Sequence, residues 1–249
     1  MLKVALIGAG NLGSHLFKTW CHHSDVQLTQ WLNRSSTQSN REGISIIQSL
    51  SQIREADVYH LAIPDREITS VSMNLPADGM AVHSSGTVSM GDLKNKGDKG
   101  ILYPLQTLTK SEEIEFQSIP FFLETNNETS HLKALADSLS PKQHWMSSEQ
   151  RLQLHMAAVY VNNFSNHFYQ IASEICEKNN IPFEVMLPLV DETARKVHKM
   201  APSSAQTGPA RRNDSTVIEK HLKHIENPEH REIYRILSHA IQKQFNDKL

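Results

Sequence analysis

The chain of 249 residues contains only two cysteines, Cys21 and Cys176, and their spacing matches no metal-binding or redox motif. Such scarcity argues against a disulfide framework and is typical of a protein in a reducing compartment. Long hydrophobic runs are missing as well, since none approaches the ~18 residues that a membrane span needs. We therefore expect a cytoplasmic protein without a membrane partner. Because the first expected strand begins at residue 3, we also expect no signal peptide before it.

An excess of charge of one sign is also missing, since 25 Lys and Arg face 27 Asp and Glu. A net charge of −2 argues against general binding to nucleic acids or to acidic membranes. The 14 histidines are scattered, and His221 and His224 can share a helix face without an evident third ligand, so we expect no metal site. What is present is a 39% share of hydrophobic residues, enough to build the core of a globular protein.

The first thirteen residues carry the motif around which the chain is organised, G-x-G-x-x-G at Gly8, Gly10 and Gly13. An apolar run at residues 4–7 precedes it, as in a buried strand, and an apolar stripe at helical spacing follows it. In such a strand-turn-helix unit the glycines allow, in order, a tight turn, close approach of a pyrophosphate and packing of the helix on the sheet. The context predicts a dinucleotide site that also includes Asn11 and Leu12, with the phosphates at the helix N-terminus. The alternative is a tight turn without a ligand.

The end of the second expected strand, residues 26–32, indicates which dinucleotide binds. An acidic residue at this point would bind the ribose hydroxyls of NAD, whereas an arginine accommodates the 2′-phosphate of NADP. The chain has no carboxylate here and instead places a cation, two hydroxyls and an amide in sequence, at Asn33, Arg34, Ser35 and Ser36. These groups complement a phosphate and predict NADP. Otherwise Arg34 is a solvated residue on a loop.

Strands and helices alternate through the first half of the chain. We expect strands at residues 44–47, 57–63, 80–83, 100–107, 119–123 and 143–146, and helices at 50–55 and 126–140. This order predicts a doubly wound parallel sheet of the Rossmann type, which binds ligands at the carboxyl ends of its strands. We therefore expect Ala62, Ile63 and Pro64 beside the cofactor, and His60 in the core. A substrate pocket or an ordinary turn is expected at Ser84, Ser85 and Gly86.

The pattern becomes helical near residue 147, where Ser147 and Gln150 have the spacing of a capping box. An apolar-periodic segment of about 30 residues follows, far longer than an average helix. Further helices are expected from Pro182, at residues 215–226 and from residue 228, with a loop at 201–214. We therefore predict a Rossmann-like domain at residues 1–147 and an all-helical domain at 148–249. Because the long helix is apolar on several faces, we also predict that this second half holds a homodimer together.

Five motifs give the chain its resemblance to a known family. They are GAGNLG at 8–13, VHSSG at 82–86, YPLQT at 103–107, RLQLHMAA at 151–158 and TGPARRND at 207–214. With the long helix, they resemble the superfamily of 6-phosphogluconate dehydrogenase, ketopantoate reductase and pyrroline-5-carboxylate reductase. More closely, they resemble a bacterial family in which a Rossmann-like domain of NADP-oxidoreductase type precedes a helical domain of unknown function. The resemblance implies an α/β fold with NADP as cofactor.

The long helix and one loop are where the resemblance points to chemistry. In enzymes similar to ketopantoate reductase the long helix carries a lysine with asparagines four and eight residues later, and from His155 these positions hold Val159 and Asn163. The resemblance implies that His155 replaces the lysine as proton donor and that Asn163 orients the substrate, since histidine donates protons near neutral pH. Arg212 could bind a carboxylate or phosphate, unless the loop is an ordinary surface loop with an Arg–Asp pair.

These observations predict an NADP(H)-dependent oxidoreductase that reduces a small, anionic carbonyl or imine substrate by hydride transfer. A deazaflavin-dependent NADP reductase would have a similar first half. A non-catalytic NADP-binding sensor or scaffold is the alternative from another functional class, and the missing lysine favours it. Tight NADPH binding without turnover of any ketoacid or imine would indicate the sensor.

Overall fold

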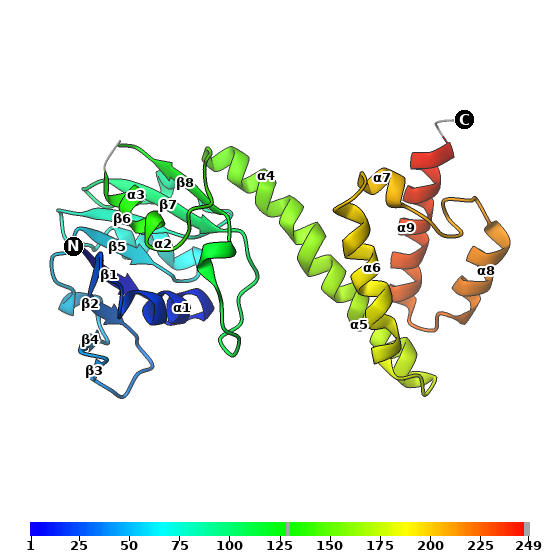
Figure 1. The fold of residues 1–249 in the computed structure, drawn as a ribbon, viewed down its shortest axis with the longest axis horizontal. Helices are drawn as coiled ribbons and strands as arrows, with labels where there is room; N and C mark the ends of the chain where they lie inside the picture. Colours follow the sequence, from blue (N-terminus) through cyan, green and yellow to red (C-terminus); the bar gives the residue numbers. More distant parts are fainter. Residues whose placement is uncertain (128–129, 247–249) are drawn as a thin grey trace. The chain divides into compact units, whose positions relative to one another are not determined.

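The structure, a computed structural model, describes residues 1–127 and 130–246 and divides into two compact units, Met1–Asn163 and Phe164–Leu249 (Figure 1). The expected boundary at 147/148 lies at the beginning of the long helix. The structure instead groups the first part of that helix, up to Asn163, with the sheet. The reason is packing: Leu154 contacts the small core cluster of Ile101, Tyr103 and Phe122. The sheet unit therefore includes the helical residues that matter for the site.

The first unit is built on a nine-stranded sheet in the order β3-β4-β2-β1-β5-β6-β7-β8-β9. The strands are β1 Leu2–Ile7, β2 Val26–Leu32, β3 Asn40–Arg41, β4 Ile44–Ile47, β5 Val58–Leu61, β6 Met80–His83, β7 Lys99–Pro104, β8 Phe121–Thr125 and β9 Gln143–Trp145. Pairing is parallel except between β3 and β4 and between β7 and β8. The predicted doubly wound fold is confirmed, whereas β3 and the antiparallel pairing of β8 were not expected.

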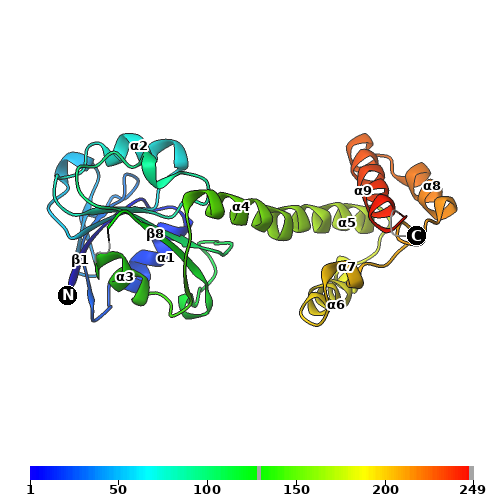
Figure 2. The same cartoon turned by 90° about the horizontal axis from the view of Figure 1, so that it is seen from above.

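Helices cover both faces of this sheet, as Figure 2 shows, with α2 on one side and α1 and α3 on the other. Their bounds are α1 Asn11–Trp20, α2 Asp65–Ser72 and α3 Ser130–Asp137, with single turns η1 Leu50–Gln52, η2 Met90–Asp92 and η3 Phe116–Ser118. Alternation along β1 builds the two cores, because Val4 and Leu6 join one apolar cluster while Ala5 and Ile7 join the other. The sheet is thereby buried on both faces.

One expected helix, at residues 50–55, is only the turn η1. The turn ends at Ile53, which adopts an extended backbone. The Arg54 N–H then donates to the side-chain amide oxygen of Gln30, Oε1, at 2.6 Å instead of to a helical carbonyl. A tertiary hydrogen bond therefore overrides local helix propensity at this point.

The second half is helical, as predicted. The long helix runs as α4 Ser148–Ala158, a π-helical segment η4 Val159–Phe164 and α5 Ser165–Lys178, followed by η5 Phe183–Met186, α6 Leu187–Val197, α7 Pro202–Ala205, α8 Ser215–His224 and α9 Pro228–Asn246. The capping box of α4 is confirmed, because Ser147 Oγ accepts from the Gln150 N–H and Gln150 Oε1 accepts from the Ser147 N–H. The π-segment was not expected.

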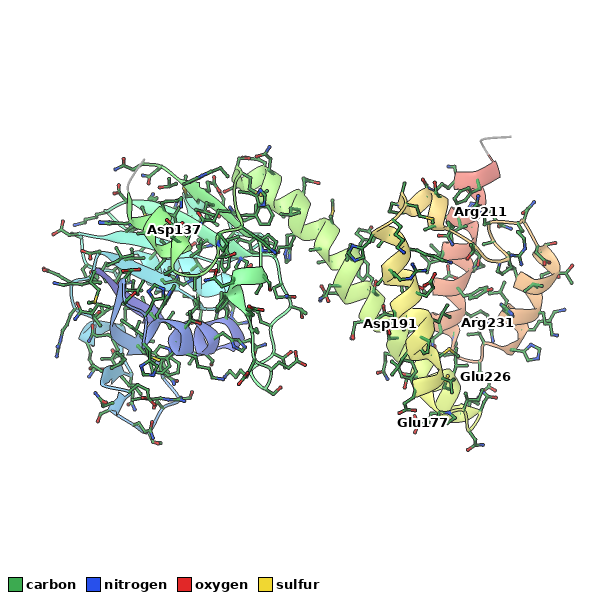
Figure 3. The ribbon with its side chains drawn as sticks, viewed as in Figure 1. Asp137, Glu177, Asp191, Arg211, Glu226 and Arg231 are labelled. Atoms are coloured by element: carbon green, nitrogen blue, oxygen red, sulfur yellow. The ribbon has the colours of Figure 1, made fainter. Side chains whose placement is uncertain are left out.

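Polar contacts join the ends of helices within the second unit, where Figure 3 labels Glu226 and Arg231. Lys178, the last residue of α5, forms an ion pair with Glu226, and the Arg231 guanidinium donates to the Ile225 carbonyl at 2.6 Å. These contacts fix the turn that leads into α9. No helix within the described ranges is both long enough and apolar enough to cross a membrane.

Candidate functional site

The glycine-rich turn between β1 and α1 shows a different reason for each glycine. Gly8 has φ +112°, and a Cβ there would lie 2.1 Å from the Ala62 carbonyl oxygen. A Cβ on Gly13 would lie 2.3 Å from the Gly8 carbonyl oxygen. Gly10 differs, because its φ of −68° suits any residue and a Cβ there would meet no atom within 4 Å. The protein's own packing therefore requires Gly8 and Gly13, whereas the open space at Gly10 fits the approach of a pyrophosphate.

A cavity of about 820 Å³ opens beside this turn, at the carboxyl ends of the strands. Its volume lies within the ~300–1,000 Å³ of typical small-molecule pockets. The structure brings twelve of the predicted site residues into its lining: Gly8, Gly10, Asn11, Leu12, Asn33, Arg34, Ser35, Ala62, Ile63, Pro64, Ser84 and Ser85. Gly13 is not among the lining residues because it packs under the turn, and neither is Ser36, whose hydroxyl binds the backbone of Gln38.

Arg34, the predicted reader of a 2′-phosphate, forms an ion pair across the cavity lining. Its Nη2 donates to Glu67 Oε2 at 3.0 Å, and the Arg34 side chain is 68% exposed. Beside it, the Ser35 hydroxyl donates to Asn33 Oδ1 at 3.0 Å. An exposed guanidinium with a neighbouring hydroxyl and backbone N–H groups is a donor set that fits a phosphate. Glu67, in the first turn of α2, was missed by the sequence analysis because only the fold brings α2 to the end of β2.

Asn11 has a role that the sequence did not reveal. Its side-chain amide donates to the Leu108 carbonyl at 2.6 Å, and His15 Nε2 lies 2.9 Å from the Thr109 carbonyl. The loop after β7 is therefore tied to the first turn of α1. Because the Asn11 side chain is hydrogen-bonded to this loop, the Asn11 backbone is the part that remains to contact a ligand in the cavity.

Ser84 belongs to a buried hydrogen-bonded chain at the end of β6. Its hydroxyl donates to the Leu102 carbonyl at 2.6 Å, so it accepts from His60 Nε2 at 2.9 Å, since a hydroxyl has one proton. Burial, with a smaller effect from His83, lowers the pKa of His60 from 6.5 to about 3, so the ring is neutral. His60 is thus a core histidine, although its Nδ1 finds no partner in the described part of the chain.

Ser85 ties together the loops that follow β5 and β6. Its hydroxyl donates to Asp65 Oδ2 at 2.8 Å and accepts from the N–H groups of Thr87 and Val88, each at 3.0 Å. The Thr87 hydroxyl donates to the same Asp65 oxygen. With its hydroxyl committed to these bonds, Ser85 shapes the cavity wall by holding the loop.

A second cavity of about 440 Å³ contains both predicted catalytic residues, His155 and Asn163. Its lining is apolar and amide-bearing: Tyr103, Leu105, Gln106, Thr107, Leu154, His155, Ala157, Ala158, Val159, Val161, Asn162 and Asn163. The two residues do not lie on an uninterrupted α-helix, because η4 changes the helix geometry between them. They line the same cavity nevertheless, and π-helical segments are frequent at functional sites.

Gly86 packs directly against His155, a residue that lines the second cavity. A Cβ on Gly86 would lie 2.4 Å from His155 Nδ1, so the backbone of this loop packs against the imidazole ring. Two residues earlier, Ser84 lines the larger cavity. The segment 84–86 therefore has one end in the dinucleotide-sized cavity and the other against His155.

Arg151 is a buried charge one helical turn before His155. Its side chain is 1% exposed and pairs with Glu124 Oε2 at 2.7 Å, with further bonds to the Val88 carbonyl and to Ser148 Oγ. Ser148 Oγ in turn donates to Glu124 at 2.6 Å. The beginning of α4 is thereby anchored to β8. The sequence carried Arg151 within a motif, but its partner is 27 residues away and could not be identified from spacing.

The loop with Arg212 lies in the helical unit. Arg212 is exposed, Asp214 caps α8 by accepting from the Val217 N–H at 3.1 Å, and Arg211 stacks over the Phe245 ring at 4.9 Å. The helix beginning at Ser215 is confirmed. Across the residues that the structure describes, no group of three or more His, Cys, Asp or Glu side chains could hold a metal ion.

Comparisons with known proteins place the chain among oxidoreductase-like structures. Residues 119–241 match a family model described as a domain of unknown function, DUF2520. The crystal structure of a putative NADP oxidoreductase from Bacteroides fragilis is 35% identical, covers 97% of this chain and 98% of its own, and has a TM-score of 0.87. A protein from Thermotoga maritima is 21% identical over 98% of this chain and 99% of its own, with a TM-score of 0.72.

A more distant similarity extends to a pyrroline carboxylate reductase from Plasmodium falciparum, solved with NADP bound. It is 13% identical, covers 97% of this chain and 98% of its own, and has a TM-score of 0.61. At this identity the likeness concerns the fold alone. A search of curated proteins finds no match.

Proposed function

Since the chain belongs to the family of the putative NADP oxidoreductase from Bacteroides fragilis, we propose that it is an NADP(H)-dependent oxidoreductase that reduces a small carbonyl or imine. The observation that carries this proposal is the segment 84–86. It lines the cavity beside the glycine-rich turn with Ser84 and contacts His155 in the second cavity with Gly86. A dinucleotide in the first cavity and a substrate in the second would therefore meet at this segment.

The residues of the second cavity suit a reduction. Bound NADPH supplies the hydride. A substrate oxygen or nitrogen that gains electrons then needs a proton, and His155 is the titratable ring that lines the cavity beside Tyr103. Asn163 offers an amide to orient the substrate, while Leu154 and Val159 exclude water from its apolar part.

We also propose that Arg212, which is exposed on the loop before α8, binds the anionic group of the substrate. An exposed guanidinium can bind a carboxylate or phosphate through two hydrogen bonds. We expect the change Arg212→Ala to raise the KM for an anionic substrate and to leave NADPH affinity unchanged. Equal KM values would make this loop ordinary surface.

We further propose that the protein is a cytoplasmic homodimer. Its cysteines are free thiols, which fits a reducing compartment. In the described part of the helical unit, the apolar residues that are buried are only Cys176, Ala210 and Ile218, whereas large apolar residues are exposed on several of its helices. A second copy of the chain is the simplest cover for such surfaces.

The test is NADPH oxidation by the purified protein across a panel of small ketones, ketoacids and cyclic imines, with and without a carboxylate. We expect turnover of at least one anionic compound, dependent on NADPH and lost in His155→Ala while NADPH still binds. Tight NADPH binding with no turnover across the panel would favour a sensor or scaffold. Turnover only of a deazaflavin would favour the deazaflavin-dependent reductase.

A further inference from the structure

Tyr103, on β7, is a buried tyrosine that the reaction chemistry above does not use. Its side chain lines the second cavity, and the residue as a whole is 8% exposed. Its hydroxyl lies 3.0 Å from His155 Nδ1, and the two rings meet edge to face with centroids 5.9 Å apart. The sequence marked it only as part of the motif YPLQT.

The hydroxyl of Tyr103 keeps its proton. Burial raises the pKa of Tyr103, and only the charge of Arg151 acts in the other direction. A protonated phenol donates to an imidazole nitrogen that has a lone pair and accepts from one that carries a proton. Among the described residues, His155 Nδ1 is the partner that the structure gives this hydroxyl, so a donating Nδ1–H would leave the phenol proton without an acceptor. We therefore take Nδ1 as the acceptor, which puts the ring proton of neutral His155 on Nε2.

Two further contacts hold the surroundings of the His155 ring, one beside the ring itself and one on the helix that carries it. Gly86 packs against its Nδ1 side so closely that even a Cβ would collide at 2.4 Å. One turn earlier on α4, Arg151 is fixed by Glu124 at 2.7 Å, which sets the position of the helix. With Nδ1 held by Tyr103, Nε2 is the ring nitrogen that remains for a ligand in the cavity.

We propose that Tyr103 is a positioning residue that holds His155 in the tautomer with its proton on Nε2, presented to the substrate. The inference rests on the proposed function for the role of His155, but not for the tautomer itself. In this arrangement Nε2–H donates a hydrogen bond to the substrate carbonyl oxygen or imine nitrogen before the hydride arrives. A single, fixed tautomer means that no part of the population presents a bare lone pair to the substrate.

The experiment is ¹⁵N NMR of the histidine rings at a pH where His155 is neutral, in the full-length protein, with His155→Gln to identify its signals. The variant Tyr103→Phe removes the hydroxyl and keeps the ring. Tyr59→Phe is the matched control, because Tyr59 is also buried and its hydroxyl binds the Ala56 N–H, away from both cavities. We expect the Nε2–H tautomer alone in the wild type and in Tyr59→Phe, and a mixture of both tautomers in Tyr103→Phe.

A wild-type proton on Nδ1, or an unchanged tautomer in Tyr103→Phe, would overturn the proposal. If a substrate is found, Tyr103→Phe should lower kcat at least about tenfold, as part of the ~10²–10⁴-fold that a positioned acid contributes. The KM and the Kd for NADPH should stay the same, whereas a merely structural role would change them together. Failure of NADPH to bind the wild type would reject the proposed function and leave the NMR result standing.

Discussion

Arg34 Nη2 donates to Glu67 Oε2 at 3.0 Å, and both residues line the cavity beside the glycine-rich turn. If the Arg34 guanidinium binds a 2′-phosphate, it must either bind the phosphate and the Glu67 carboxylate together or break its bond to Glu67. Glu67 is therefore a competitor for the same cation, and the pair sets how much of the charge of Arg34 is available to NADP.

Arg34→Ala should weaken NADPH binding by roughly 1.5–3 kcal/mol, the value of a hydrogen bond to a charged group, which is about ten- to 150-fold in Kd. NADH should be nearly unaffected because it lacks the phosphate. Titration calorimetry with both cofactors measures the difference. An equal loss for NADPH and NADH would remove Arg34 as the reader of the phosphate.

Glu67→Gln should tighten NADPH binding by up to about fivefold, since exposed ion pairs contribute ~0.2–1 kcal/mol. The matched control is Glu55→Gln, which removes the same charge just before the amino end of β5, away from the cavity lining. NADPH affinity should not change in this control. Weaker binding in Glu67→Gln would mean that Glu67 supports the cofactor instead of competing with it.

Glu124→Gln should destabilise the sheet unit by about 3 kcal/mol, because it leaves the buried guanidinium of Arg151 without its countercharge. Urea unfolding gives the free energy of unfolding. Glu192→Gln is the control, since Glu192 pairs with Arg195 on the surface and should show no measurable change. Similar stability of the two variants would show that the pair of Arg151 and Glu124 is not an anchor of α4.

Two buried histidines predict how stability depends on pH. Burial lowers the pKa of His60 to about 3 and that of His83 to about 4, while both return to about 6.5 on unfolding. Below pH 6.5 the unfolded chain therefore binds protons that the folded chain does not, so stability falls as pH decreases toward 4. The expected slope is up to about 1.4 kcal/mol per pH unit for each histidine.

Urea unfolding at pH 7 and pH 5 tests this dependence. His60→Gln should reduce the difference in unfolding free energy between the two pH values, whatever its effect at pH 7. His22→Gln, a change at an exposed histidine, should leave that difference as it is in the wild type. If His60→Gln keeps the full difference, the neutral buried state of His60 is refuted.

The helical unit should associate through exposed apolar side chains, among them Val185, Leu187, Leu189, Val197 and Ile236. Light scattering at micromolar concentration should give the mass of two chains of 28.2 kDa each. Leu189→Glu should shift the protein toward one chain, whereas Met73→Glu should not, although both residues are 64% exposed and Met73 belongs to the sheet unit. A wild-type mass of one chain would contradict the dimer.

Local patterns carried much of the fold. The strands 26–32, 44–47 and 80–83 were predicted with the bounds that the structure shows, because apolar alternation in the first, short apolar runs in the other two and the turn residues that follow define them. Contacts between distant segments could not be predicted from local patterns. The partner of Arg151 lies 27 residues away, and Glu67 meets Arg34 only because the fold brings the first turn of α2 near the residues that follow β2. The π-segment η4 was missed because the spacing argument assumed 3.6 residues per turn throughout.

The most direct test of the central claim, that the cavity at the glycine-rich turn holds NADP(H), is NADPH binding to the wild type and to Gly10→Val. The space beside Gly10 contains no protein atom within 4 Å of an added Cβ, so the variant should unfold at the wild-type temperature. Gly91→Val, in the exposed turn η2, is the matched control and should bind NADPH normally. The account predicts at least about 100-fold weaker NADPH binding in Gly10→Val, a loss of ~2.7 kcal/mol. Unchanged affinity in Gly10→Val, or no binding by the wild type, would contradict it.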